Sequence, residues 1–200
     1  MPEFTLHDET SAPEASRPHL ASAKQRMGFI TTLNAVMAES PELLAGYNAL
    51  ADLFGKSSLP ARAKHVVWVT ASVQNGCEYC VAAHSTLALK SGLDDAAVTA
   101  LRESKPLNDD KLDAARRFTA SMVTGLGWVP DEEVEEFLAA GYTKRNVLDV
   151  VLGLGMKTLS NYTNHIVHTP LDPAWQQQEW RRSSRPQPAR ASLCGHRQDT

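Results

Sequence analysis

Two cysteines and a histidine lie close together near the middle of the chain, and their types and spacing favour thiol chemistry. Cys77 and Cys80 are three positions apart, a spacing at which two thiols can meet in a disulfide at a helix start. His84 follows Cys80 by four positions, so on a helix the two side chains lie one above the other and can share a hydrogen bond. A cysteine at the helix start also meets the positive end of the helix dipole, which favours thiolate over thiol.

The composition is that of an ordinary soluble globular protein, with 42% hydrophobic and 22% charged residues among 200. We expect one domain with a sizeable core. The formal net charge of -3 gives no general attraction to nucleic acid or to an anionic membrane, so neither is expected as a partner. The acidic, proline-interrupted start does not resemble a secretory signal, and no apolar stretch is long enough to span a bilayer. We therefore expect a cytoplasmic protein.

The cysteine pair has several chemical interpretations. With three cysteines in a reducing compartment, the Cys-x-x-Cys pair indicates redox chemistry or metal binding rather than a structural disulfide framework. Cys77, Cys80 and His84 could supply three zinc ligands, but no second closely spaced pair supplies the fourth. Haem attachment is excluded because Val81, not histidine, follows Cys80. Inert buried thiols are a further alternative, although the histidine at the helical offset favours the redox interpretation.

The pattern along the chain predicts helices and no convincing strand, and therefore an all-α fold. Residues 1–22 contain three prolines among polar residues and are expected to form an extended N-terminal arm. Residues 174–200 are rich in glutamine and then basic, which predicts a disordered tail and leaves residues 23–173 as the helical domain. Helices are expected over residues 41–54, 59–74, 77–91, 94–102, 108–125, 130–140 and from 143 to before 170.

Two of these helices carry details that matter for packing. Residues 66–70 form a β-branched run that locally resembles a strand. Apolar residues at helical intervals over the wider segment, with Pro60 near its start, favour a buried helix instead. In the last helix, Gly153 and Gly155 would allow another helix to approach closely.

The segment from Asn75 to Ser85, NGCEYCVAAHS, closely resembles the alkylhydroperoxidase D-like (AhpD-like) branch of the carboxymuconolactone decarboxylase superfamily. The resemblance covers about residues 28–173 and implies an AhpD-like all-α helical bundle that assembles as a homo-oligomer. Further motifs agree with the peroxidase-related members of that branch, namely Ser40-Pro41, Leu59-Pro60 with Ser72, residues 140–143 (AGYT), residues 161–166 (NYTNHI) and residues 169–172 (TPLD).

The resemblance implies that Cys80 is the peroxidatic cysteine and that Cys77 resolves it. The Cys80 thiolate, its proton accepted by His84, would attack the distal oxygen of a hydroperoxide and leave an alcohol and a sulfenic acid. Cys77 would then condense with this sulfenic acid to give water and a Cys77–Cys80 disulfide. An external dithiol, such as a lipoyl protein or thioredoxin, would reduce the disulfide, and no bound cofactor is expected.

One position departs from the family pattern, in which a glutamate twelve residues before the first cysteine completes a proton relay. Here that position is His65, which can pass protons near neutral pH but cannot supply a fixed negative charge. We therefore include His65 among the candidate catalytic residues and expect a weaker peroxidase activity. Glu78 is an alternative carboxylate, although its place between the cysteines directs it off their helical face.

Other functions stay open on the same residues. A non-enzymatic redox sensor or thiol-disulfide module would be oxidised once per chain, whereas an enzyme would turn over when given a dithiol. A lactone-decarboxylating or other acid–base activity could use His65 and His84, although that branch of the superfamily lacks the Cys-x-x-Cys pair. Packing is the simplest role for Tyr79, and Cys194 is most simply a free thiol.

Overall fold

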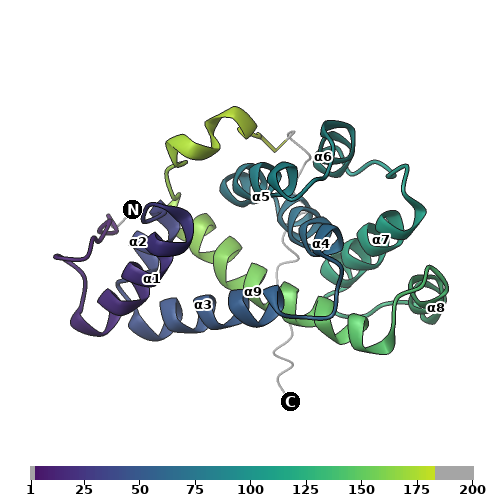
Figure 1. The fold of residues 1–200 in the computed structure, drawn as a ribbon, viewed down its shortest axis with the longest axis horizontal. Helices are drawn as coiled ribbons and strands as arrows, with labels where there is room; N and C mark the ends of the chain where they lie inside the picture. Colours follow the sequence, from purple (N-terminus) through teal and green to yellow (C-terminus); the bar gives the residue numbers. More distant parts are fainter. Residues whose placement is uncertain (1–2, 183–200) are drawn as a thin grey trace, which may run out of the picture.

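The fold is all-helical, as the sequence predicts (Figure 1). The computed structural model describes residues 3–182, which contain no strand. None of the helices within that range is long and apolar enough to cross a membrane. The elements are η1 (Glu14–Ser16), α1 (Arg17–Met27), α2 (Thr32–Met37), α3 (Pro41–Gly55), α4 (Ala61–Gln74), α5 (Glu78–Lys90), α6 (Asp95–Arg102), α7 (Asp110–Thr124), α8 (Asp131–Ala139), α9 (Lys144–Val167) and η2 (Pro173–Gln178).

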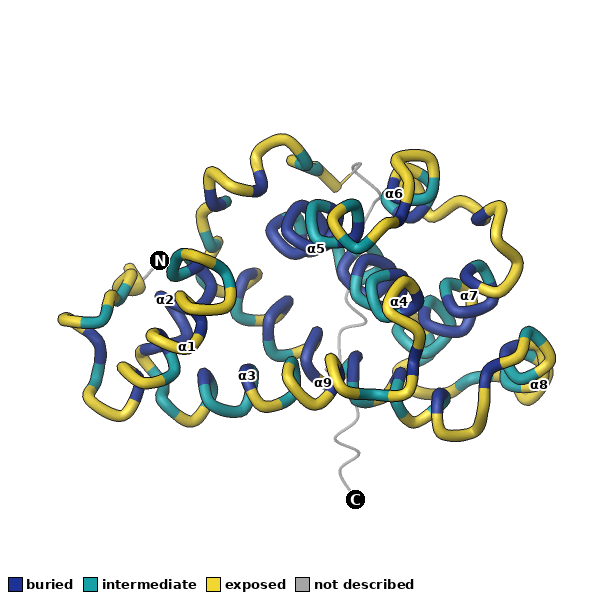
Figure 2. Tube along the Cα trace, viewed as in Figure 1, coloured by how far each residue is buried: buried dark blue, intermediate teal, exposed yellow. Residues whose placement is uncertain are grey.

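The α4–α5 hairpin lies at the centre of the molecule, and both of its helices are mostly buried (Figure 2). Helix α4 packs against α5, α6, α7 and α9, so it is covered on several sides at once. This explains why residues 66–70 are apolar and β-branched although they are helical, and it confirms the predicted helix. Gly76 makes the turn into α5 with a φ of +67°, a conformation that favours glycine.

Helix α9 is the longest helix, and it runs across the molecule in contact with α2, α3, α4 and α5 (Figure 1). It begins with a capping box in which Thr143 and Asn146 satisfy each other's backbone groups. The predicted close approach is confirmed at Gly153, where an added Cβ would lie 2.6 Å from Cε2 of Phe54 on α3. It is wrong at Gly155, where an added Cβ would meet no atom within 4 Å.

The two glycines make a matched stability test. Gly153→Ala is expected to lower the free energy of unfolding by about 1–3 kcal/mol, because its methyl group would overlap the buried Phe54 ring. Gly155→Ala is expected to raise that free energy by up to about 1 kcal/mol, because alanine favours the helix and the site is open. Urea unfolding of both variants measures the difference. Equal effects of the two substitutions would contradict the packing described here.

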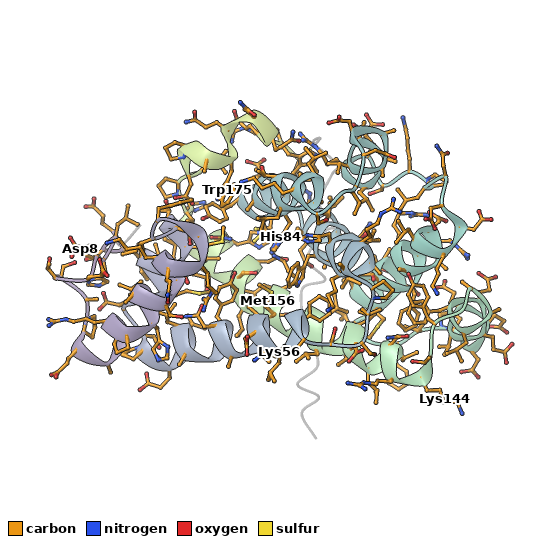
Figure 3. The ribbon with its side chains drawn as sticks, viewed as in Figure 1. Asp8, Lys56, His84, Lys144, Met156 and Trp175 are labelled. Carbon is orange, nitrogen blue, oxygen red and sulfur yellow. The ribbon has the colours of Figure 1, made fainter. Side chains whose placement is uncertain are left out.

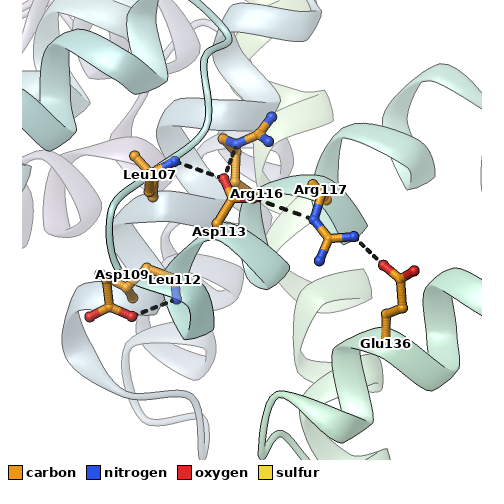
Figure 4. Close-up of polar contacts among 7 residues, drawn as sticks. All are labelled: Leu107, Asp109, Leu112, Asp113, Arg116, Arg117 and Glu136. Atoms are coloured by element: carbon orange, nitrogen blue, oxygen red, sulfur yellow. Dashed lines mark hydrogen bonds and ion pairs between the residues drawn. The ribbon is translucent and has the colours of Figure 1, made fainter.

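Helix α8 is fixed to α7 by a group of polar contacts (Figure 4). Asp113 on α7 accepts hydrogen bonds from the backbone N–H of Leu107 at 2.9 Å and from Nε of Arg116 at 2.6 Å. Arg117, one position later, pairs with Asp113 and also with Glu136 on α8. These contacts organise the side of the bundle formed by α7 and α8.

The expected extended arm over residues 1–22 is wrong for its second half. Residues from Arg17 onward form α1, and Leu20 and Ala23 are buried against the N-terminal part of the bundle. The Ser16 hydroxyl donates to the carbonyl of Ala38 at 2.7 Å and holds the start of α1 on the end of α2. Packing of these few apolar residues therefore stabilises a helix whose sequence has little amphipathic pattern of its own.

The expected disordered tail is also wrong for its first nine residues. Residues 171–182, which we call the C-terminal strap, contain η2 and pack against α5. Trp175 is only 2% exposed because it fills a core that α1, α2 and α5 share, beside the ring of Phe29. The rest of the predicted tail, including Cys194, lies outside the described residues.

Candidate thiol redox site

The two cysteines of the motif lie at the start of α5, buried and unpaired. The helix begins at Glu78, one residue later than predicted, so Cys77 is its N-cap residue. Cys80 lies in its first turn. Both are free thiols, with only 1% and 2% of their surfaces exposed. The backbone N–H of Cys77 donates to the carbonyl of Ser72 at 2.9 Å, which ties the start of α5 to the end of α4.

A polar face of α9 lies against the thiols. Lys157, Ser160 and Asn164 follow one another at helical spacing, and all three are buried. Nδ2 of Asn164 donates to Sγ of Cys80 at 3.2 Å and also lies 3.6 Å from Sγ of Cys77. Asn164 belongs to the family motif at residues 161–166, which implies no role for it, and no motif points to Lys157 or Ser160. The available signal was the recurrence of polar residues every three to four positions in an otherwise apolar helix.

The surroundings of the two thiols separate their pKa values. Burial by itself would raise the pKa of Cys80, because a thiolate loses its hydration inside the protein. Hydrogen bonding by Cys77 and the positive charge of Lys157 outweigh burial, with help from Ser160, and hold this pKa well below its ordinary value. The pKa of Cys77 is raised, first by its hydrogen bond to Cys80 and then by burial. The site therefore favours a thiolate at Cys80 and a protonated thiol at Cys77.

His84 lies beside this site on α5, with its ring against the indole of Trp68 at a centroid distance of 5.0 Å. Burial, followed by the positive charge of Lys157, holds the pKa of His84 well below its ordinary value, so its imidazole is neutral at pH 7. Its Nδ1 is buried, and no hydrogen bond joins His84 to Cys80 among the described residues. His84 therefore stands next to the thiols as a neutral ring.

His65 contacts the same indole from its place on α4. Its ring meets Trp68 edge-on at a centroid distance of 5.6 Å, so Trp68 contacts both histidines. Burial and then the charge of Lys64 lower the pKa of His65. The structure thus brings Cys77, Cys80 and His84 together, whereas His65 does not line the cavity beside Cys80 but contacts Trp68, which does, and its charge helps to lower the pKa of His84.

The neutral histidines predict a loss of stability in acid. The unfolded chain binds protons at His84 as the pH falls through about 6.5, whereas the folded protein resists protonation there. The free energy of unfolding should therefore fall by up to roughly 1.4 kcal/mol per pH unit for this residue between about pH 6.5 and 5. Urea unfolding at a series of pH values, for the native protein and His84→Gln, measures the slope. A slope that His84→Gln leaves unchanged would contradict the neutral state of this histidine.

A cavity of about 190 Å³ lies directly beside Cys80 and His84. Met156 of α9 and Trp175 of the strap also line it, and Figure 3 places their side chains with His84 in the middle of the molecule. The remaining lining residues come from α1 to α5 and from the N-cap of α2. They are Ala23, Arg26, Met27, Thr31, Leu33, Asn34, Tyr47, Asn48, Ala51, Trp68, Tyr79, Ala83 and Leu87.

Tyr79 has a structural role between the cysteines and the strap, in line with the packing role considered from the sequence. Its hydroxyl donates to the buried carboxylate of Asp172 and accepts from the backbone N–H of Leu33 at 3.4 Å. Asp172 also accepts from the N–H and the hydroxyl of Thr32 at 3.0 and 2.8 Å. Burial and then the charge of Asp172 raise the pKa of Tyr79, so the phenol stays protonated. These contacts join α5, α2 and the strap.

The zinc alternative receives no support from the geometry. Within residues 3–182, no three histidine, cysteine, aspartate or glutamate side chains are grouped so that they could hold a metal ion. The positive charge that faces Cys80 comes instead from Lys157. The chemistry that fits the site is therefore that of a thiolate with a neighbouring thiol.

A sequence comparison matches part of the chain to a known family. Residues 41–125 match the model of the Carboxymuconolactone decarboxylase family. The matched segment runs from the start of α3 to the end of α7 and includes both cysteines. The family resemblance inferred from the motifs is thereby confirmed. A comparison with curated proteins found no significant match.

Solved structures extend the likeness to most of the chain, which has an AhpD-like fold. An uncharacterized peroxidase-related protein from Ralstonia eutropha JMP134, described as an alkylhydroperoxidase AhpD core, has a TM-score of 0.77 and 16% identity over 86% of this chain and 93% of that chain. The debrominase Bmp8 C82A, in complex with 2,3,4-tribromopyrrole, has a TM-score of 0.75 and 18% identity over 89% and 96% of the two chains. An uncharacterized peroxidase-related protein from Silicibacter sp. TM1040 has a TM-score of 0.72 and 19% identity over 87% and 95%.

Proposed function

We propose that the protein is a thiol-dependent hydroperoxidase that cycles between a Cys77–Cys80 dithiol and a disulfide. The observation that carries this proposal is the geometry of the site: two free thiols lie buried at the start of α5, and Nδ2 of Asn164 donates to Sγ of Cys80 at 3.2 Å. These surroundings lower the pKa of Cys80 and raise that of Cys77, which fits Cys80 as the nucleophile. A thiolate is the reactive form toward a peroxide, and a neighbouring protonated thiol is what a resolving step requires. The roles that the family resemblance gives to the two cysteines fit this arrangement.

The cycle has three balanced steps. The Cys80 thiolate attacks the distal oxygen of ROOH, the O–O bond breaks, and the leaving alkoxide takes a proton to become ROH. The resulting Cys80 sulfenic acid condenses with the Cys77 thiol, which forms the disulfide and releases water. An external dithiol then reduces the disulfide by exchange and leaves as its own disulfide.

His84 has a narrower role in this proposal than that of a resting proton acceptor. The surroundings of Cys80 already favour its thiolate, and the low pKa of His84 means that a proton accepted there is not retained. A neutral imidazole can instead pass the proton that the alkoxide needs. His65 contacts Trp68 and acts electrostatically on His84, and its part in the relay stays a prediction.

Turnover with a dithiol tests the proposed enzyme against the redox sensor. The reduced protein is mixed with excess hydroperoxide and either dihydrolipoamide or reduced thioredoxin, and peroxide consumption per chain is followed. Consumption of many equivalents supports the enzyme. Consumption of a single equivalent with both reductants would overturn it and leave the sensor. Because the cycle needs reduced thiols between turnovers, a cytoplasmic location is part of the proposal.

A second candidate is reductive dehalogenation, which one observation favours: Cys80 lines a cavity with apolar and aromatic walls. The fold is similar to that of a debrominase solved in complex with a brominated pyrrole. In this second candidate, the Cys77–Cys80 dithiol of this chain would supply two electrons to a brominated ring. The C–Br bond is replaced by C–H, and bromide leaves as the disulfide forms. Release of bromide from 2,3,4-tribromopyrrole by the reduced protein, compared with Cys80→Ser, separates this activity from peroxide reduction.

We also propose that the protein forms a homo-oligomer through the exposed face of α9. Leu148, Val151, Tyr162 and Ile166 lie on one face of this helix at helical spacing and are 69%, 49%, 56% and 63% exposed. A row of exposed apolar side chains of this size is typical of an interface. Sedimentation of the native protein and of Ile166→Glu tests it, with a lower oligomeric state expected for the variant. A native monomer would contradict the proposal.

A further inference from the structure

We infer that the cavity beside Cys80 is a binding site for a molecule with one aromatic ring and a hydroxyl-type group on the end of the ring away from the thiol. The inference rests on the proposed function only where it identifies the ligand as the substrate of the peroxidase. The binding of the ligand is argued from the cavity alone. The size of the cavity, the aromatic walls and a pair of unpaired amide atoms each support it independently.

The volume limits the ligand to a single ring. An engineered apolar cavity of about 150 Å³ holds benzene, and the cavity here measures about 190 Å³. The difference is close to the ~30 Å³ that one water molecule occupies in the liquid, which leaves room for a small substituent. A fused pair of rings would need substantially more space. The cavity reaches the surface at Arg26, which lines it and is exposed, so a polar substituent can extend in that direction.

The walls are suited to an aromatic ring. The rings of Tyr47, Trp68, Tyr79 and Trp175 all contribute to the lining, and Leu87 belongs to its apolar part. Aromatic side chains contact a ligand ring in offset-stacked or edge-to-face arrangements. One end of such a ligand would lie at Cys80 and His84, where the reaction takes place.

Two buried asparagines supply the hydrogen-bonding groups. Nδ2 of Asn34 donates to the hydroxyl of Thr31 at 2.6 Å, and Oδ1 of Asn48 accepts from Arg26 at 3.0 Å. These bonds fix both amides and leave Oδ1 of Asn34 and Nδ2 of Asn48 buried with no partner in the described residues. A buried polar atom without a partner costs free energy unless a ligand or water satisfies it. Because both residues line the cavity, a ligand hydroxyl, which can both donate and accept, would supply a partner to either atom.

These features define the substrate class as a small phenolic hydroperoxide, with the peroxide group at Cys80 and the phenol toward Asn34 and Asn48. A saturated alkyl hydroperoxide would leave the aromatic walls and the two amides without their partners. Hydrogen peroxide would use none of the cavity. The site therefore selects for the ring and its polar end as well as for the reacting group.

The test measures binding in a protein that cannot turn over. The double variant Cys77→Ser/Cys80→Ser is titrated with 4-hydroxybenzyl alcohol, which is the size of the proposed product, and binding is followed by calorimetry and ligand-detected NMR. Benzyl alcohol, which lacks the phenol, should bind about 3- to 10-fold more weakly. The two-ring analogue 6-(hydroxymethyl)-2-naphthol should bind more weakly than 4-hydroxybenzyl alcohol, because its second ring exceeds the volume of the cavity. Because no peroxide is used, failure of the peroxidase assay leaves this result intact.

Two further variants assign the binding to this cavity. Ala83→Leu would occupy part of the cavity, and Asn48→Leu would remove the free donor, so each should weaken binding of 4-hydroxybenzyl alcohol by at least about 3-fold. Circular dichroism and thermal unfolding check that each variant is folded, and if one is not, the other carries the test. The inference is overturned if 4-hydroxybenzyl alcohol does not bind, if the naphthol binds equally well, or if a folded variant binds as tightly as its parent.

Discussion

Lys157→Met is expected to return the pKa of the Cys80 thiol to its ordinary value or above and to slow peroxide reduction at pH 7 by roughly 10- to 100-fold. Lys157 is fully buried on the face of α9 that meets the thiols, and its positive charge is a main reason for the low pKa of Cys80. Without that charge, the hydrogen bonds from Cys77 and Ser160 oppose burial alone, so the pKa rises toward that of an ordinary thiol. At pH 7 a thiol with a pKa near 8.5 is ionised to only a few per cent, so most of the reactive form is lost.

The thiolate absorbance at 240 nm, titrated with pH in a Cys194→Ser background, measures this effect directly. The native protein should lose the Cys80 thiolate only in acid, whereas Lys157→Met should gain it only at alkaline pH. Lys64→Met on α4 is the matched control, because this lysine lowers the pKa of His65 but does not act on Cys80. Methionine has a similar length and leaves no unpaired buried charge, so the variant should still fold. An unchanged titration in Lys157→Met would contradict the assigned role.

Cys77→Ser is expected to consume one equivalent of peroxide per chain and then stop, whereas Cys80→Ser is expected to consume none. The reason lies in the separation of the two pKa values: only Cys80 is held as a thiolate, while Cys77 keeps its proton until the resolving step. Serine at position 77 cannot condense with a sulfenic acid, so the oxidised Cys80 accumulates. The loss of steady-state turnover should exceed 1000-fold in both variants, which is the largest effect expected of any substitution here.

Rapid-quench measurement of peroxide consumption, with dihydrolipoamide present, distinguishes the two variants. Cys194→Ser is the control and should keep full turnover, because the proposed cycle uses only the pair on α5. Continued turnover of Cys77→Ser would mean that the external thiol resolves the sulfenic acid directly. That outcome would remove Cys77 from the mechanism and leave Cys80 as a one-cysteine site.

Much of the central hairpin could be predicted from sequence, because its signals are local. The turn at Gly76 and the helical spacing between Cys80 and His84 depend only on neighbouring residues, and the structure contains both features. The β-branched run in α4 was resolved correctly by the periodicity of its wider segment. The expected start of the last helix at residue 143 also agrees with α9, for which Thr143 is the N-cap residue.

The α9 side of the site could not be predicted in the same way. Lys157 and Ser160 follow a helical period, but the sequence does not state whether that face meets solvent or another helix. A lysine in this position is ordinarily solvated, and only its packing against α5 gives it an electrostatic role. Similarly, the contacts of Trp68 with both His65 and His84 depend on how α4 packs against α5, which the sequence does not give.

The N-terminal error has a specific cause. The prolines of residues 1–22 favour an extended arm in the sequence pattern. In the structure, however, Pro13 is the N-cap residue of η1 and Pro18 lies in the first turn of α1. Proline is well tolerated at such positions because the first N–H groups of a helix have no partner within it. The glutamines after Trp175 likewise favour disorder in the sequence pattern. In the structure the buried indole of Trp175 is enough to hold the strap against the bundle.

The most direct test of the central claim is to add one equivalent of hydroperoxide to the fully reduced native protein and to map its peptides by mass spectrometry without reduction. The account predicts that a disulfide between Cys77 and Cys80 forms in nearly every chain, with one equivalent of alcohol released. Recovery of both thiols in the reduced form, or oxidation only at Cys194, would contradict it.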